Sequence, residues 1–260
     1  MSWRSFITAR FGIIGAVVEF GGAKKRGLAA SVGAGVALAW ARMKRTVGIF
    51  IFLCVIASGL AGAPTNRVLF VENFARGLTN KNWQNLAFFK PPTAYTLVRD
   101  GTNFCLHGVA ERTCSAMSVK LDLPAPKQLK LRWRWRIEGV NPNASERDLK
   151  KFDHAARVFI AFDTFVGPPR TLNYMWGNVE KVGAVLPHPK SSRAQIFVLQ
   201  SGNARTNEWV TEARDVTADW KKVFGDRVMP RIVGLGAMTD NDSLGQRLVG
   251  DYADFELWQE

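Results

Sequence analysis

The stretch Leu129-Lys130-Leu131-Arg132-Trp133-Arg134-Trp135-Arg136-Ile137-Glu138 decides the fold class of this chain. Apolar and charged residues alternate along it without interruption, and an extended strand places such residues on opposite faces of a sheet. We therefore expect its leucines, tryptophans and isoleucine to face a core. The opposite face, formed by Lys130, Arg132, Arg134, Arg136 and Glu138, is expected to meet water, a groove or acids on neighbouring strands.

Short runs with a β-type pattern recur along the rest of the chain, separated by clusters of Gly, Pro, Asn and Asp. Asp100-Gly101 predicts a two-residue turn in a hairpin spanning 95–106. The remaining expected strands are 67–72, 115–123, 156–162, 171–176, 194–200, 209–215, 231–238 and 251–258. This cadence predicts an all-β chain, a single antiparallel β-sandwich of jelly-roll type.

One short helix is expected within this sandwich. Thr217 is a suitable N-cap, residues 218–224 form the body, and Gly225 ends it. No internal repeat or coiled-coil pattern accompanies it.

A secretory signal peptide is predicted at residues 43–63. Met43-Lys44-Arg45 forms a positive start, 47–57 is an unbroken apolar run, and 58–63 is rich in small residues. Cleavage after Ala61 and cleavage after Ala63 both satisfy the need of signal peptidase for small residues just before the cut. The expected mature protein is the domain of residues 64–260, located in the periplasm or outside the cell.

Residues 1–42 precede this signal and need a separate explanation. We expect them to be an over-extended start or a non-functional leader. The alternative is an uncleaved, membrane-embedded hairpin, although both apolar runs in this segment are short for a bilayer span. No membrane span is expected in the mature protein.

The charge of the chain is unevenly distributed. The formal net charge is +13, but the first 63 residues hold eight of the 35 basic residues and one of the 22 acidic residues. A nucleic-acid-binding protein needs a concentrated basic stripe, which the remainder lacks. We therefore expect no nucleic-acid partner, and we expect a monomer.

Two cysteines, Cys105 and Cys114, follow the predicted signal peptide. An oxidising compartment favours a disulfide between them, and two buried thiols facing apart are the alternative. A zinc site is not expected, because the chain has three histidines and no Cys-x-x-Cys motif.

Several short motifs recur together along the chain. They are Trp133-Arg134-Trp135-Arg136, Ala155-Ala156-Arg157-Val158-Phe159, Tyr174-Met175-Trp176-Gly177, Ser201-Gly202 with Trp209, Phe224-Gly225 and Met238-Thr239-Asp240-Asn241-Asp242. Over residues 68–258 this set resembles an uncharacterised bacterial family of exported proteins, domain of unknown function 3047. The resemblance implies one β-sandwich domain, usually behind a signal peptide, with no established activity and no catalytic residues to transfer. The chain departs from the family at Asp153-His154, where the family often has paired acids, and this puts any two-carboxylate site there in doubt.

No catalytic residue can be named from the sequence. Nucleophile-elbow, His-Glu-x-x-His and phosphate-loop patterns are missing. A glycosidase needs two carboxyl groups across one bond, and Glu138, Asp153 and Asp163 are the candidates near the long strand. Solvated surface acids are the alternative for all three.

No cofactor is expected, apart from a candidate calcium site at Asp240, Asp242 and Asp251. Carboxylate oxygens in such a loop are hard ligands suited to Ca²⁺. The pattern does not match an EF-hand loop, and a loop stabilised by Asx turns without an ion is the alternative.

The arginine face of the long strand is the candidate ligand site. Arginines at every second position repel one another unless acids on adjacent strands pair with them. We expect Arg157 with Asp153 or Asp163, on the following strand, to supply these contacts. Stacking rings and forked charged groups are how β-sandwiches grip sugars, although packing in the core is the alternative for the aromatics. The candidate ligand-binding residues are Arg132, Arg134, Arg136, Asp153, Arg157, Tyr174 and Trp176.

The predicted function is a non-catalytic exported binding module for a glycan or another envelope polymer. The alternatives are a polysaccharide hydrolase or lyase that uses paired acids, and a structural envelope protein that binds another protein. A salt-bridged sheet face would weaken both ligand hypotheses, and a groove beside Arg132, Arg134 and Arg157 would support them.

Overall fold

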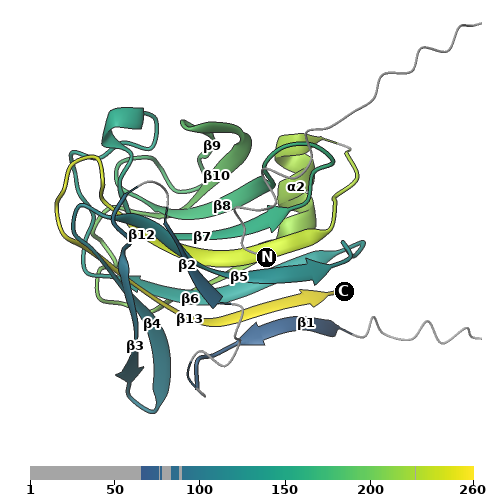
Figure 1. The fold of residues 1–260 in the computed structure, drawn as a ribbon, viewed down its shortest axis with the longest axis horizontal. Coiled ribbons are helices and arrows are strands. Elements are labelled where there is room, and N and C mark those ends of the chain that lie inside the picture. Colours follow the sequence, from purple (N-terminus) through teal and green to yellow (C-terminus); the bar gives the residue numbers. More distant parts are fainter. Residues whose placement is uncertain (1–65, 76, 78–82, 88–89, 226) are drawn as a thin grey trace, which may run out of the picture. The chain divides into compact units, whose positions relative to one another are not determined.

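The computed structural model describes residues 66–75, 77, 83–87, 90–225 and 227–260. Two sheets lie one over the other and form a β-sandwich, as the alternating pattern predicted (Figure 1). The predicted signal peptide and the segment before it lie outside the described residues. None of the helices described is both long enough and apolar enough to cross a bilayer.

The six-stranded sheet is centred on the long strand. It has the order β11-β6-β13-β4-β3, and β1 also pairs with β13. All of its pairs are antiparallel. Its strands are β1 (Arg67–Glu72), β3 (Ala94–Asp100), β4 (Asn103–Ala110), β6 (Leu129–Ile137), β11 (Val210–Asp215) and β13 (Leu248–Gln259).

The seven-stranded sheet has the order β2-β5-β12-β7-β8-β10-β9. Among its described pairs, β8 and β10 run parallel and the others antiparallel. Its strands are β2 (Trp83–Ala87), β5 (Cys114–Leu123), β7 (His154–Phe162), β8 (Arg170–Gly177), β9 (Val185–His188), β10 (Ser191–Ser201) and β12 (Ile232–Asp240).

The core between the sheets is built on aromatic rings. Trp133 and Trp135 of β6 are fully buried, as expected, and their ring centroids lie 5.3 Å apart in an edge-to-face arrangement. Trp133 packs against Tyr174 and Trp135 against Trp176, at 5.2 and 5.8 Å. Tyr174 and Trp176 were candidate ligand residues, and that prediction is wrong because both rings join the two sheets within the core.

The two sheets approach each other closely at Gly250 of β13. A Cβ atom there would clash with the backbone oxygen of Ala155 and would lie 2.7 Å from the Thr239 hydroxyl. The Thr239 hydroxyl donates to that same Ala155 oxygen at 2.8 Å. This contact explains why a glycine occupies the third position of the long strand β13.

The expected helix forms as α2 (Val216–Phe224), but its N-cap is Asp215 rather than Thr217. The Asp215 carboxylate accepts from the Ala218 N–H at 2.8 Å, whereas the Thr217 hydroxyl accepts from the Leu129 N–H of β6. Gly225 ends the helix with φ of +70°, as predicted. A short 3-10 helix, η1 (Leu149–Lys151), lies in the loop before β7.

The β3–β4 hairpin is present, with its turn displaced by one residue from the prediction. Asp100 pairs with Asn103, so the turn residues are Gly101 and Thr102. Gly101 has φ of +62°, which is the left-handed conformation expected of the glycine.

Candidate functional site

The outer face of β6 carries the predicted ladder of basic residues, and every one of them is paired. Arg134 Nε donates to Asp254 Oδ2 at 2.5 Å, and Arg136 Nε donates to Asp251 Oδ2 at 2.9 Å. Arg132 pairs with Glu256, and Lys130 pairs with Asp215. The acids therefore come from the two neighbouring strands, β13 and β11.

The expected partners of this ladder were wrong. Arg157 and Asp153 belong to β7 and the loop before it, and β7 pairs with β12 and β8 in the other sheet. Alternation along β6 predicted which side chains share a face, but the strand that follows in sequence lies across the core. These two residues thus form no part of the site on β6.

A pocket of about 390 Å³ opens beside the ladder, between β1, β6, β11 and β13. Its lining combines guanidinium donors, carboxylate acceptors, a hydroxyl and an amide. This volume lies in the range typical of small-ligand pockets. The lining residues are Val71, Asn73, Arg132, Arg134, Thr211, Asp254, Phe255 and Glu256.

Trp209 sits next to this pocket and was not placed by sequence reasoning. The guanidinium carbons of Arg134 and Arg136 lie 5.0 and 4.7 Å from its ring centroid. Its indole N–H donates to Asp100 Oδ2 at 2.6 Å. The half-buried ring is therefore held in a defined orientation against the arginine ladder.

Asp254 owes its position to an irregularity in β13. The register between β13 and β6 shifts between Ala253 and Glu256, so β13 carries one extra residue, and Asp254 with Phe255 stands opposite Trp133 alone. Asp254 has φ of +53°, a left-handed conformation that Asp tolerates better than most residues. Bulges commonly re-aim side chains next to binding sites, and here the bulge presents the carboxylate to Arg134 and the pocket.

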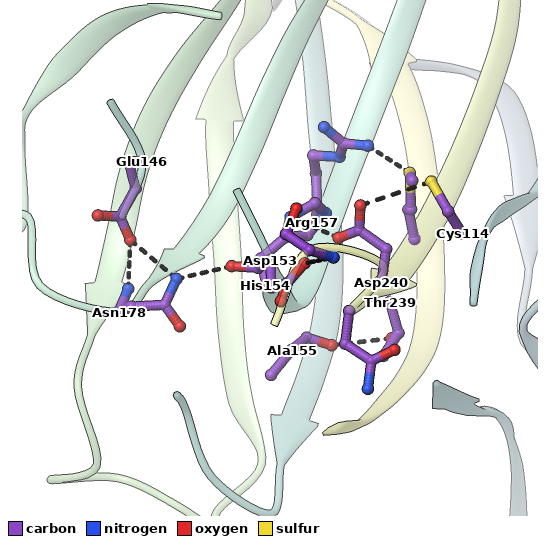
Figure 2. A network of polar contacts seen from close by, with 12 residues as sticks. Cys114, Glu146, Asp153, His154, Ala155, Arg157, Asn178, Thr239 and Asp240 are labelled. Carbon is purple, nitrogen blue, oxygen red and sulfur yellow. Dashed lines mark hydrogen bonds and ion pairs between the residues drawn. The ribbon is translucent and has the colours of Figure 1, made fainter. Parts of the chain in front are cut away.

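A second polar cluster lies on the other sheet, around Arg157 and Asp240 (Figure 2). His154 Nδ1 is 2.7 Å from Asp240 Oδ1, and both side chains are almost fully buried. Burial lowers the pKa of His154 although Asp240 acts in the opposite direction, so the imidazole is neutral. Arg157 Nη1 donates to His188 Nε2 at 3.1 Å.

Loops are anchored to this buried cluster. The Asp153 carboxylate accepts from the Ser243 and Leu244 N–H groups, at 2.9 and 2.7 Å, and burial raises its pKa. Its backbone oxygen accepts from the Asn178 side chain (Figure 2). Asp153 is 2% and Arg157 7% exposed, so neither presents a surface to a ligand in this structure, and both serve to hold loops.

The three acids of the candidate calcium site are not brought together. Asp251 lies on β13, where it pairs with Arg136 and with His107 Nδ1, which is 2.7 Å away. Asp240 and Asp242 stay close to each other and to Cys114, with ligand atoms within 4.8 Å. A thiol and an imidazole around Asp240 are not the oxygen ligands that calcium requires, so that set of three is wrong.

The expected disulfide is also wrong, because Cys105 and Cys114 are free, buried thiols in the structure. They lie on β4 and β5, which belong to different sheets. The Cys114 thiol donates to Asp240 Oδ2 at 3.7 Å. Burial raises the pKa of each thiol to about 12, with Asp251 the next cause at Cys105 and Asp240 at Cys114.

The acids proposed for hydrolysis have separate partners. Glu138 accepts from Arg247 Nη1 at 2.6 Å at the end of β6, and Asp163 accepts from the Thr164 N–H after β7. Asp153 is enclosed by its own loop contacts. Each carboxylate is therefore accounted for by contacts within its own part of the fold.

The chain belongs to the family described as Protein of unknown function (DUF3047), whose model matches residues 81–256. This confirms the resemblance found from the motifs. No curated protein matches the chain.

Three solved structures illustrate what the chain is similar to. A family 11 carbohydrate-binding module from Clostridium thermocellum, in complex with a β-1,3-1,4-mixed-linked tetrasaccharide, is 12% identical with a TM-score of 0.39, covering 74% of this chain and 94% of its own. TmCBM61 in complex with β-1,4-galactotriose is 12% identical with a TM-score of 0.38, at 72% and 94% coverage. The xyloglucanase domain of NopAA from Sinorhizobium fredii, in complex with cellobiose, is 10% identical with a TM-score of 0.39, at 68% and 93% coverage.

Proposed function

We propose that this protein is a non-catalytic binding module that holds a glycan, or another polyhydroxylated envelope polymer, in the pocket beside Arg132 and Arg134. The observation that carries the proposal is the polar pocket of about 390 Å³ on the outer face of the six-stranded sheet. The solved structures with bound sugars are too distant in sequence and shape to carry it.

The pocket offers the hydrogen-bonding groups that sugar hydroxyls need. A hydroxyl both donates and accepts, so it is best held between a cation and a carboxylate. Arg134 with Asp254, and Arg132 with Glu256, present that combination at the pocket wall. Thr211 and Asn73 add neutral groups that donate and accept.

The salt-bridged ladder supports binding because it fixes the geometry of these groups before a ligand arrives. Arg134 is held by Asp254 on one side and by the Trp209 ring on the other. A side chain that is already ordered loses little conformational entropy on binding. A salt-bridged face was expected to weaken the ligand hypotheses, but here the ion pairs leave a pocket open beside them.

Export to the periplasm or beyond remains part of this proposal, supported by the signal-like pattern at residues 43–63. An envelope location would bring the pocket into contact with polysaccharides. The family match is compatible with it, since the motif resemblance implied exported proteins.

Affinity electrophoresis and titration calorimetry with a panel of neutral and anionic polysaccharides test the proposal. We expect Arg134→Ala to weaken binding by about tenfold to a hundredfold, the value of a charge-assisted hydrogen bond, while the fold persists. Arg231→Ala is the matched control, because Arg231 pairs with the exposed Asp122 on the other sheet. No release of reducing ends is expected.

The proposal fails if the parent protein binds no polysaccharide in the panel, or if both variants weaken binding equally. Turnover of a bound polysaccharide would favour the hydrolase alternative. Specific capture of one envelope protein, without any glycan binding, would favour the structural alternative.

A further inference from the structure

The end of the sandwich at α2 carries apolar side chains that point into solvent. Phe165 and Val166, in the turn between β7 and β8, are 91% and 66% exposed. Val228, in the segment after α2, is 89% exposed. Single exposed apolar residues are common, but several projecting from one end of a domain mark a contact surface.

These residues belong to one neighbourhood. Ile232 pairs with Phe162, so the segment after α2 enters β12 beside the end of β7. The Asp163 N–H donates to the Arg231 oxygen at 2.8 Å, which ties the start of the β7–β8 turn to that segment. Figure 1 shows α2 at this end of the strands.

Arginines gather around the same turn. Arg170 and Arg193 lie at the starts of the neighbouring strands β8 and β10, where Ala194 pairs with Thr171. The Arg170 guanidinium carbon lies 5.1 Å from the ring centroid of Phe224 at the end of α2, three residues before Arg227. Burial lowers the pKa of Arg170, and the positive charges of Arg227 and Arg193 lower it further. Arg193 Nη1 donates to the Pro168 oxygen in the turn. Within the described residues, none of the three forms an ion pair with a carboxylate. The turn itself carries one carboxylate, Asp163, which accepts from the Thr164 N–H, so the arginines outnumber it and the local charge favours an anion.

An apolar pocket of about 370 Å³ lies next to this cluster. Trp220, Val228 and Met229 supply apolar lining, and the charged residues of the lining are all basic. The complete lining is Ala125, Pro126, Lys127, Thr217, Trp220, Lys221, Gly225, Arg227, Val228 and Met229.

We propose that this end of the molecule docks on an anionic lipid surface, with Phe165, Val166 and Val228 in the interfacial region. Arg170, Arg193 and Arg227 then meet the headgroup phosphates. Exposed aromatic and aliphatic tips ringed by basic residues are the chemistry of peripheral membrane binding. A soluble polyanion would satisfy the arginines but would leave the apolar tips in water.

The docking surface is distinct from the proposed glycan pocket. The glycan pocket lies on the six-stranded sheet, whereas the arginines and apolar tips belong to the seven-stranded sheet and the segment after α2. A failure of glycan binding therefore leaves this proposal standing, and the reverse also holds.

Hydrogen–deuterium exchange of the full chain, with and without vesicles, tests the proposal locally. Phosphatidylcholine vesicles containing 30% phosphatidylglycerol should slow exchange at residues 163–170 and 227–231 by about tenfold, as expected for a covered segment. Pure phosphatidylcholine vesicles should not. Exchange at residues 178–184, at the opposite end of β8, should stay unchanged with both.

Variants separate lipid insertion from simple charge attraction. Phe165→Ser/Val166→Ser should lose the protection, and Arg227→Gln should weaken it. Val179→Ser/Val182→Ser is the matched control, because these valines are also exposed but lie at the far end of β8. Unchanged exchange on anionic vesicles overturns the proposal, and so does protection that survives Phe165→Ser/Val166→Ser, which would indicate binding by charge alone.

Discussion

Asp254 combines an unusual backbone with a contact at the candidate site. Its φ of +53° lies in the left-handed region, and its carboxylate accepts from Arg134 Nε at 2.5 Å. Residues in this conformation persist when surrounding structure holds them, and they often occur at functional sites. The site therefore depends on one residue for both its backbone shape and its charge.

Replacing Asp254 separates these two roles. Asp254→Gly and Asp254→Val both remove the carboxylate, so both should lose glycan binding. Glycine accepts the left-handed conformation without cost, whereas valine does not, so Asp254→Val should be less stable than Asp254→Gly by about 1–2 kcal/mol in urea unfolding. Equal stability of the two variants would show that the bulge is not held in this conformation in solution.

Trp209 shows what a single residue's sequence context does not reveal. The sequence places it at the start of the expected strand 209–215, which has no clear alternation, so nothing local assigns it to a face. In the structure β11 begins one residue later, at Val210. Its position follows from Asp100, which lies far away in sequence and accepts its N–H. The aromatics that could be judged from alternation, Trp133 and Trp135, lie in the core as expected.

At the scale of elements, α2 depends on a cap that also joins two strands. Asp215 ends β11, caps the helix through the Ala218 N–H, and pairs with Lys130 of β6 at 3.0 Å. Because one carboxylate does all three, the start of the helix is fixed to the edge of the six-stranded sheet.

Substitutions at Asp215 test how much its N-cap contributes to the free energy of unfolding. Asp215→Ala should lower the free energy of unfolding by about 1 kcal/mol, the usual value of an N-cap, as measured by urea denaturation. Asp215→Asn should retain most of that stability. Lys130→Gln breaks the ion pair and keeps the cap, so a loss as large as that of Asp215→Ala would assign the effect to the ion pair instead.

The elements were predictable where a local pattern exists. β1 has the predicted bounds, and the long strands lie within a few residues of theirs. β2 and β9 were missed, because runs of four or five residues without alternation resemble loops. The assignment of β7 to the other sheet was not predictable, because the period along a strand specifies faces and not neighbouring strands.

The candidate site was predictable only in part for the same reason. The basic residues that line the pocket stand in one alternating strand, so Arg132 and Arg134 could be named. Their acidic partners, Asp254 and Glu256, come from β13, more than a hundred residues later, and a bulge positions one of them. Pairing between distant strands carries no signal in a single sequence.

At the scale of the whole molecule, burial acts on two histidines and two thiols, and it favours the neutral form of each. Burial lowers the pKa of His188 to about 3, with Arg157 the next cause, and burial also lowers the pKa of His154. Burial raises the pKa of Cys105 and of Cys114 to about 12. Folding therefore opposes protonation of the histidines and ionisation of the thiols.

The stability of the protein should consequently be greatest between about pH 6.5 and 8.5, the ordinary pKa values of histidine and cysteine. Below this window His188 and His154 bind protons in the unfolded chain but not in the folded protein. The free energy of unfolding therefore falls as pH falls from about 6.5 towards 3. Above it the unfolded thiols ionise while the folded ones do not, so stability falls again as pH rises towards 12. Each extra proton contributes a slope of about 1.4 kcal/mol per pH unit.

Two variants test which residues cause the loss of stability at acid pH (the acid limb) and at alkaline pH (the alkaline limb). Stability is measured as the urea midpoint at a series of pH values. His188→Gln keeps an acceptor for Arg157 but cannot be protonated, so it should flatten the acid limb and leave the alkaline limb unchanged. Cys105→Ala should flatten the alkaline limb and leave the acid limb unchanged. Each variant is the control for the other, because they alter different sheets of the sandwich. An acid limb that is equally steep in His188→Gln would show that His188 takes up its proton in the folded protein, and that Arg157 is not held against a neutral imidazole.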